Sequence, residues 1–218
     1  MLKIYGVARS RAARTIWLAN ELGLRFELVP VMQAYRMAKP DAADAALNTR
    51  SPAFLKINPS GQIPTISDGD LVLHESLAIN LYLAKKYGGP LAPAGLAEDA
   101  LMLQWTLWAV AAAEPQINQV LMNRLIKPVA ERDSAAAAAA VDGLRAPFAV
   151  LDLALAAQSY LVGGRFTVAD LNVAEVMRYA LSAPELFDAA PRVKAWLAAC
   201  HARPAFKAMM AQRELELD

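Results

Sequence analysis

Two serines, Ser10 and Ser76, stand where a predicted strand gives way to a predicted helix. The first turn of a helix has free N–H groups and a partial positive charge, so a hydroxyl group there can help to bind an anion. Ser10 is followed by Arg14, four residues along the predicted helix, and Ser76 is preceded by Glu75, whose carboxylate suits an ammonium group. Glu75 and Ser76 together therefore fit the amino-acid end of a ligand. Both serines also fit ordinary helix capping. Tyr5, on the predicted strand before Ser10, is either a competing hydroxyl donor or a packing residue.

A proline, Pro64, begins a predicted strand directly after Gln62 and Ile63. Proline lacks the N–H group that a strand uses in pairing, so it belongs at a strand start or in a special turn. A cis peptide bond before Pro64 would turn the main chain of Ile63 outward, where it can pair with an extended peptide ligand. The alternative is a trans proline at a strand edge, which the rarity of cis bonds favours on sequence alone.

The segment from Phe166 to Leu171 carries the pattern of a helix start. Thr167 fits the N-cap and Asp170 the third helical position, which makes a carboxylate form of the capping box. Phe166 and Leu171 occupy the two positions of a hydrophobic staple. We interpret this segment as a folding feature and assign it no catalytic role.

Apolar periodicity predicts the element order βαβ followed by ββα in the first part of the chain. Strands are predicted at 2–7, 26–29, 63–67 and 71–74, and helices at 11–22 and 75–87. The connection 31–58 is polar and rich in alanine, with one short helix predicted near 41–47.

The stretch from Gly88 to Gly95 is the best candidate for a linker. It divides the chain into a domain at 1–87, a linker at 88–96 and an all-helical domain at 97–218. Alanine, the strongest helix former, is concentrated after residue 93. Helices are predicted at about 97–123, 132–158, 168–182, 191–203 and 204–212, and Pro115 should kink or break the first of them.

Composition excludes several functional classes. The chain has 218 residues, enough for one or two domains with a sizeable core. Its 22 basic and 21 acidic side chains are interspersed, which argues against nucleic acid or an anionic membrane as a partner. A single cysteine, Cys200, excludes a disulfide framework, and two histidines leave little for a metal site. The start lacks an apolar signal core, and the longest near-apolar run, 101–113, is too short to span a bilayer. These observations predict a soluble, cytoplasmic protein without a metal.

Four segments, taken in order, resemble a soluble, bacterial-like glutathione transferase over essentially the whole chain. They are Tyr5–Ser10 with Arg14, Asn58–Pro64, Glu75–Ile79 and Thr167–Leu171. Each is weak alone, but all four occur at the spacing of the family. The resemblance implies an α/β thioredoxin-like N-terminal domain, an all-α C-terminal domain, a homodimer and a role in detoxification.

The resemblance also implies roles for individual residues. Ile63, before a cis Pro64, should meet the cysteinyl main chain of glutathione, while Glu75 and Ser76 hold its γ-glutamyl end and Gln62 assists. Three basic residues are candidates for the glycine carboxylate, and the variable stretch 31–56 prevents a choice among them: Arg36, Lys39 and Lys56.

The family activates the thiol of glutathione with a tyrosine, a serine or a cysteine. This chain has no cysteine near residues 8–10, and Tyr5 lacks the residues that usually follow the tyrosine of the tyrosine-type classes. Ser10 with Arg14 resembles the serine-type theta and delta enzymes, so we favour Ser10 as the hydroxyl donor and keep Tyr5 as the alternative.

The second substrate should be an apolar electrophile bound between the domains. Met102, Trp105 and Trp108 fall on nearby faces of one predicted helix and are candidates to line its pocket, although such a stripe also fits a core or a dimer interface. We therefore expect an enzyme that activates the glutathione thiolate for attack on apolar electrophiles. The alternatives are a glutathione-dependent dehalogenase, isomerase or peroxidase, and a non-catalytic member that binds apolar ligands or a protein.

Overall fold

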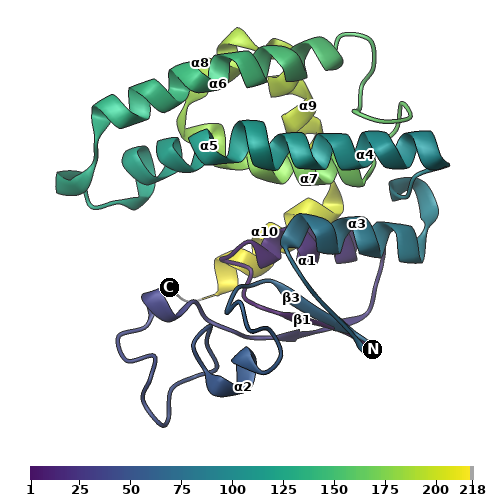
Figure 1. Cartoon of the computed structure of the whole chain (residues 1–218). Helices are drawn as coiled ribbons and strands as arrows, with labels where there is room; N and C mark the ends of the chain where they lie inside the picture. The colour runs from purple at the N-terminus through teal and green to yellow at the C-terminus, as the bar shows by residue number, and fades with distance from the viewer. Residues whose placement is uncertain (217–218) are drawn as a thin grey trace. The chain divides into compact units, whose positions relative to one another are not determined.

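A four-stranded mixed sheet organises the first part of the chain in the computed structural model, which describes residues 1–216 (Figure 1). The strands are β1 (Leu2–Tyr5), β2 (Phe26–Val29), β3 (Thr65–Asp68) and β4 (Leu71–His74), in the order β2-β1-β3-β4. Strands β1 and β2 are parallel, because helix α1 (Ala12–Glu21) connects them, whereas β3 is antiparallel to both β1 and β4. This confirms the predicted thioredoxin-like βαβ-ββα order.

Three helices cover one face of this sheet, and the short α2 (Pro52–Leu55) lies on the other (Figure 1). The covering helices are α1, α3 (Ser76–Tyr87) and α10 (Pro204–Leu215). Ile4 and Ile66, which face each other on β1 and β3, and Trp17 of α1 are completely buried in the resulting core. The indole ring of Trp17 meets the ring of Phe206 edge to face at 4.9 Å, which joins α1 to α10.

Gly6 makes the turn from β1 toward α1 possible. Its φ of 149° lies outside the range that side-chain-bearing residues favour, and a Cβ there would lie 2.8 Å from the Cβ of Ala12. A glycine is therefore needed where the strand end passes close to the helix start. The strand ends at Tyr5, two residues earlier than predicted.

The connection between β2 and β3 differs from the sequence prediction. No helix forms near 41–47; the helical turns lie instead at Ala34–Arg36, a 3-10 turn, and at α2. The buried side chain of Asn48 donates to the carbonyl oxygens of Pro40 and Ala46, and so holds the segment as a loop. Asparagine side chains compete in this way with helical hydrogen bonds, which a periodicity argument does not take into account.

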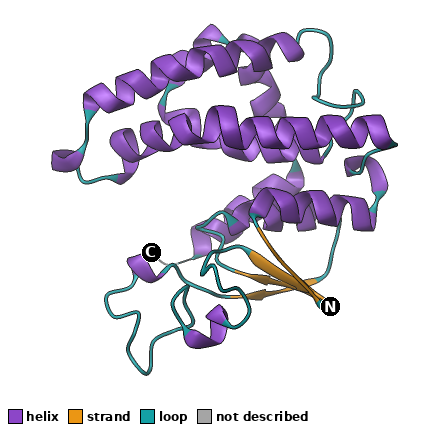
Figure 2. Ribbon diagram, viewed as in Figure 1, coloured by secondary structure: helices purple, strands orange, loops and turns teal. Residues whose placement is uncertain are grey.

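The second part of the chain is all-helical, as predicted (Figure 2). Its α-helices are α4 (Leu96–Trp108), α5 (Glu114–Leu121), α6 (Ser134–Ala154), α7 (Val168–Met177), α8 (Pro184–Ala189) and α9 (Pro191–His201). A π-helical turn at Ala109–Ala113 separates α4 from α5 just before Pro115, so the predicted interruption is confirmed. Further short turns are π-helical at Met122–Ile126 and 3-10 at Gly89–Leu91, Val129–Glu131 and Arg178–Ser182. The short helix α8 was not predicted.

Two compact units make up the fold. One contains residues 1–89 together with the segment from Arg203 on, and the other contains residues 90–202. The change of unit near Gly89 falls within the predicted linker. Helix α10 belongs to the unit with the sheet, where Arg203 forms a two-pronged ion pair with Glu21 of α1, each N–O distance being 2.7 Å.

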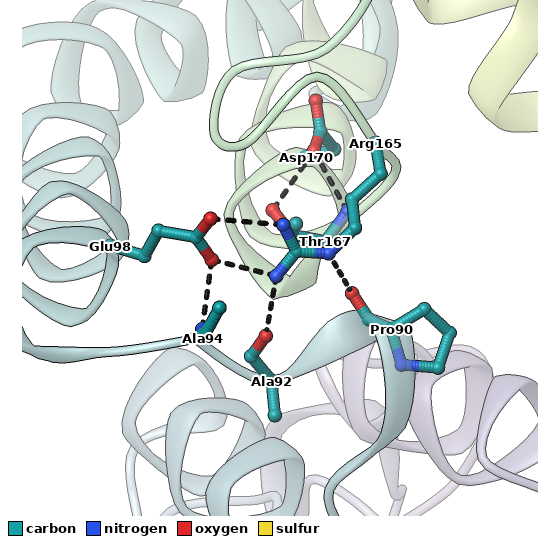
Figure 3. A network of polar contacts seen from close by, with 7 residues as sticks. All are labelled: Pro90, Ala92, Ala94, Glu98, Arg165, Thr167 and Asp170. Atoms are coloured by element: carbon teal, nitrogen blue, oxygen red, sulfur yellow. Dashed lines mark hydrogen bonds and ion pairs between the residues drawn. The ribbon is translucent and has the colours of Figure 1, made fainter.

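A polar network inside the helical unit fixes the start of α7 (Figure 3). The Asp170 carboxylate accepts hydrogen bonds from the N–H of Thr167 at 2.9 Å and of Leu161 at 2.8 Å, which confirms the predicted capping box, and from Nε1 of Trp196 at 3.0 Å. Burial raises the pKa of Asp170 although these donors favour the ionised form. Nearby, the guanidinium of Arg165 binds Glu98 and lowers the pKa of that carboxyl to about 2.

Candidate functional site

The register of the sheet brings three loops to one of its edges. Tyr5 ends β1, Thr65 begins β3 and His74 ends β4, and these residues face one another in the order Tyr5, Thr65, His74. Directly facing residues lie about 5 Å apart. The chain segments that leave or enter the sheet here are the loop with Ser10, the loop with Ile63 and Pro64, and the junction with Glu75 and Ser76. The predicted site residues of the first unit therefore converge at this edge.

Ser10 lies in the loop between Gly6 and α1, with 7% of its surface exposed. Its hydroxyl donates to the carbonyl oxygen of Val7 at 2.6 Å and accepts from the N–H of Ala12, in the first turn of α1, at 3.0 Å. The Oγ atom is therefore fixed beside the helix start, while its hydrogen can rotate to another acceptor. This position of the Ser10 hydroxyl fits both alternatives from the sequence: a cap for the start of α1 and a hydroxyl group that helps to bind an anion.

Tyr5 is directed elsewhere. Its hydroxyl lies 3.5 Å from the Oγ of Ser67 on the neighbouring strand β3, and its ring centroid is 6.3 Å from that of Phe54. Tyr5 therefore packs over the sheet and α2, and its alternative role as the hydroxyl donor stays a prediction.

Ser76 is buried at the start of α3, and Arg14 binds it. The guanidinium Nη1 of Arg14 donates to the Oγ of Ser76 at 3.2 Å, and the side chain of Asn80 donates to the carbonyl oxygen of Arg14 at 3.3 Å. Arg14 is 1% exposed, so this link runs through the protein interior between α1 and α3. Sequence reasoning noted Arg14 only for its spacing from Ser10; its distance of 62 residues from Ser76 gives no sequence signal.

Glu75 has a backbone conformation that side-chain-bearing residues rarely adopt. Its φ is 71° and its ψ 104°, and it is the one non-glycine residue with positive φ within the described chain. Such a conformation costs on the order of 1–3 kcal/mol and is concentrated at functional sites. The Glu75 side chain is exposed and makes no capping hydrogen bond to α3, so simple helix capping does not explain this residue.

The loop before β3 holds a cis peptide bond between Ile63 and Pro64, as the resemblance implied. The buried side chain of Asn58 donates to the carbonyl oxygen of Gln62 at 3.0 Å and to the Oγ1 of Thr65 at 2.9 Å. Asn58 thus fixes the loop from both sides. Within residues 1–216 the main-chain N–H and C=O of Ile63 form no hydrogen bond, which leaves them available to a ligand. The role of Asn58 was not predicted, although it opens one of the four recognised segments.

The three basic candidates for the glycine carboxylate differ in their contacts. Arg36 is half-buried and its Nη1 donates to the carbonyl oxygen of Arg9, at 3.4 Å, in the loop that carries Ser10. Lys39 and Lys56 are exposed.

The three apolar candidates lie in the helical unit, on α4. Met102 is completely buried and Trp105 nearly so, whereas Trp108 is half-buried with its ring 5.2 Å from that of Trp105. Met102 and Trp105 thus pack in the core of this unit, and Trp108 is the most accessible of the three.

Comparisons with known proteins decide the family. The model of the glutathione S-transferase N-terminal domain matches residues 9–86, and that of the C-terminal domain matches residues 100–204. This chain belongs to the glutathione S-transferase family. Glutathione S-transferase 3 of Zea mays is 36% identical, and the alignment covers 96% of this chain and 93% of the relative.

Solved structures of glutathione transferases are also similar. The theta class enzyme of Xanthomonas axonopodis, solved with glutathione bound, is 34% identical with a TM-score of 0.78, over 95% of each chain. Maize glutathione S-transferase I, in complex with an atrazine glutathione conjugate, is 29% identical with a TM-score of 0.83, over 99% of each chain. The chain is accordingly a glutathione transferase with glutathione as its co-substrate.

Proposed function

We propose that this glutathione transferase is of the serine type, with a theta- or delta-like active site in which Ser10 stabilises the thiolate of bound glutathione. The supporting observation is the position of the Ser10 hydroxyl, beside the first turn of α1 at the edge where the three loops meet. The Tyr5 hydroxyl lies over the sheet, 3.5 Å from the Oγ of Ser67 on β3, and not beside a helix start, so Tyr5 is the weaker candidate. One similar structure, solved with glutathione bound, is of the theta class, to which the residues around Ser10 are similar.

The thiol of free glutathione, like that of cysteine, ionises at about pH 8.5 and is mostly protonated at neutral pH. In the proposed step the Ser10 hydrogen turns from the Val7 carbonyl to the ligand sulfur, while the N–H of Ala12 keeps Oγ in place. The hydroxyl and the positive end of α1 then favour the thiolate, whose proton passes to solvent. The sulfur lone pair forms the S–C bond, the leaving group departs with its electron pair, and Ser10 keeps its hydrogen throughout.

The loop with Ile63 and the junction with Glu75 and Ser76 bind different parts of glutathione in this proposal. The free main-chain groups of Ile63 pair with the cysteinyl residue, beside Gln62. Ser76 accepts its hydrogen bond from Arg14, so its own hydroxyl hydrogen is available for the α-carboxylate of the γ-glutamyl end. The exposed carboxylate of Glu75 pairs with the ammonium group. Arg36 is the best placed of the three candidates for the glycine carboxylate, because it already contacts the Ser10 loop.

The second substrate is an apolar electrophile, and Trp108 is the candidate of α4 most able to contact it. We further propose a cytoplasmic homodimer: the composition predicts the location, and the resemblance implies the dimer. The atrazine conjugate in the maize relative is an example of such a product in this family.

A titration of bound glutathione tests the role of Ser10. Replacement of Ser10 by alanine removes one charge-assisted hydrogen bond, worth about 1.5–3 kcal/mol, and should raise the apparent pKa of the bound thiol by about one to two units. The thiolate absorbance is measured against pH in the wild type, in Ser10→Ala and in Ser10→Thr. The Thr variant retains a hydroxyl group and should titrate close to the wild type.

Tyr5→Phe is the matched control and should leave the titration unchanged. A raised pKa in Tyr5→Phe with a silent Ser10→Ala would assign the chain to the tyrosine type. A titration that neither change moves would exclude both hydroxyl groups as activators.

A further inference from the structure

The segment at the end of α10 binds the main chain of the loop that carries Ser10. The Glu216 carboxylate accepts from the N–H of Ala8 at 2.6 Å and from the N–H of Arg9 at 2.8 Å. Arg213, one turn earlier, donates from Nη1 to the carbonyl oxygen of Ala8 at 2.8 Å, and the Nε of Arg9 donates back to the carbonyl oxygen of Arg213 at 3.1 Å. We call this set of four hydrogen bonds the α10 clasp. It joins residues more than 200 positions apart within one compact unit.

The clasp is well suited to fix a main-chain conformation. Successive N–H groups that point into one concavity bind a carboxylate well, and charge-assisted hydrogen bonds are about twice as strong as neutral ones. Helix α10 is itself held to α1 by Arg203–Glu21 and by Phe206–Trp17, so the clasp is anchored on the helix that Ser10 precedes.

One peptide group connects the clasp to the Ser10 hydroxyl. The N–H of Ala8 and the carbonyl of Val7 belong to the same planar peptide unit. Glu216 binds the N–H of that unit, and the Ser10 hydroxyl donates to its carbonyl oxygen. The N–H of Ser10 donates to the same oxygen at 3.1 Å. Any rotation of this peptide plane therefore moves the acceptor that holds Ser10.

We propose that Glu216 and Arg213 are positioning residues for thiol activation. Glu216 binds the N–H groups of the successive peptide units Val7–Ala8 and Ala8–Arg9, and Arg213 binds the carbonyl oxygen of the second; together they hold both peptide planes, and through them the Ser10 hydroxyl, in the orientation from which it reaches the sulfur. This inference rests on the proposed role of Ser10. In this role both residues act through the main chain of the loop.

A direct effect of the charges of Glu216 and Arg213 on the sulfur would shift the thiol pKa differently from a loss of positioning. Glu216 carries a negative charge, so its loss would lower the pKa of a nearby thiol, whereas loss of the positive charge of Arg213 would raise it. Glu216 and Arg213 lie beside the same loop, so direct charge effects would shift the thiol pKa in opposite directions in the two single variants. Positioning predicts instead that loss of either residue raises the thiol pKa, because both bind the Ala8–Arg9 peptide unit, and its release loosens the adjoining Val7–Ala8 unit that holds Ser10.

The experiment compares Glu216→Gln and Arg213→Gln in the full chain with two charge-matched controls from exposed positions of α10, Glu214→Gln and Lys207→Gln. We expect both clasp variants to raise the apparent thiol pKa by about half a unit to one unit and to lower kcat by about three- to tenfold, with a smaller change in KM for glutathione. The controls should match the wild type. Amide hydrogen exchange at Ala8 and Arg9 should accelerate in Glu216→Gln but not in Glu214→Gln.

Opposite pKa shifts in the two clasp variants would show that the charges act on the sulfur directly and would overturn the proposal. Unchanged thiol pKa and kcat together with faster exchange at Ala8 and Arg9 would equally overturn it, since the clasp would then order the loop without serving Ser10. An unchanged thiol titration in Ser10→Ala, with no other substitution in the chain, would instead refute the proposed function itself.

Discussion

At the scale of single residues, the backbone conformation of Glu75 lowers the stability of the folded chain. The positive φ of Glu75 is a conformation that glycine adopts freely, yet a charged side chain stands there and makes no capping bond. Folding alone would favour glycine at this position. We therefore interpret the carboxylate as functional, in line with the proposed pairing with the ammonium group of glutathione.

Glu75→Gly should accordingly separate stability from binding. Relief of the strained φ should raise the free energy of unfolding by about 0.5–1 kcal/mol, because part of the strain is offset by the greater freedom of glycine in the unfolded chain. Loss of the carboxylate should weaken glutathione binding by about 1–2 kcal/mol, roughly tenfold in Kd, since the exposed ion pair is screened by water. Thermal unfolding and calorimetric titration measure the two effects.

Glu75→Gln is the control for this prediction, because it keeps the strained backbone and removes only the charge. It should weaken binding to a similar extent and leave the melting temperature unchanged. Wild-type affinity in both variants would remove Glu75 from the glutathione site.

At the scale of elements, the start of α7 depends on one buried carboxylate. Asp170 accepts hydrogen bonds from Thr167, Leu161 and Trp196, so it joins the helix start to the preceding loop and to α9. A simple helix cap would satisfy only its own helix. The sequence pattern identified the cap but could not reveal the other two partners.

Asp170→Ala should therefore cost more than an ordinary cap. It leaves several buried donors without an acceptor, at about 1–3 kcal/mol each, so we expect a loss of about 3 kcal/mol in the free energy of unfolding. Part of the loss is offset because the ionised carboxylate is itself buried at a cost, as its raised pKa indicates. Chemical denaturation measures the change, and Asp142→Ala, at an exposed position of α6, should stay within about 0.5 kcal/mol of the wild type.

Glutathione binding by the folded fraction of Asp170→Ala should match that of the wild type, since Asp170 lies in the helical unit and contacts no candidate site residue. A variant of undiminished stability that failed to bind glutathione would contradict the structural role.

The elements that sequence predicted well are those fixed by local patterns. Strand β2 has the predicted bounds, and α7 starts at the predicted cap, because periodicity and capping depend on neighbouring residues. The region between β2 and β3 was predicted poorly, since side-chain hydrogen bonds of Asn48 and Asn58 shape it. For the site, hydroxyl and carboxylate types at strand-to-helix junctions pointed to Ser10, Glu75 and Ser76. The partners of these residues were missed because they come from other elements: Arg14 for Ser76, and Glu216 for the Ser10 loop.

At the scale of the whole molecule, one of the two histidines makes stability depend on pH in mild acid. His74, at the end of β4, is exposed. His201, at the end of α9, is largely buried, and burial, assisted by the nearby charge of Arg178, lowers its pKa from 6.5 to about 4, although Glu175 acts in the opposite direction. The buried pair of Glu175 and Arg178, with an N–O distance of 2.7 Å, therefore does not keep the imidazole protonated at neutral pH.

His201 should make the folded protein less stable as the pH falls below neutrality. The unfolded chain binds the proton near pH 6.5 and the folded chain only near pH 4, so the stability that neutral His201 contributes is complete above pH 6.5 and is lost between pH 6.5 and about 4. The full shift corresponds to about 3 kcal/mol at most.

Urea denaturation at a series of pH values measures the slope of the free energy of unfolding against pH. His201→Gln, which cannot titrate, should lose most of it, and His74→Gln should keep it. Asp170, whose pKa is raised, acts in the opposite direction, but it is present in all three proteins and cancels from their differences. Equal slopes in the wild type and His201→Gln would mean that His201 is protonated as easily in the folded chain as in the unfolded one.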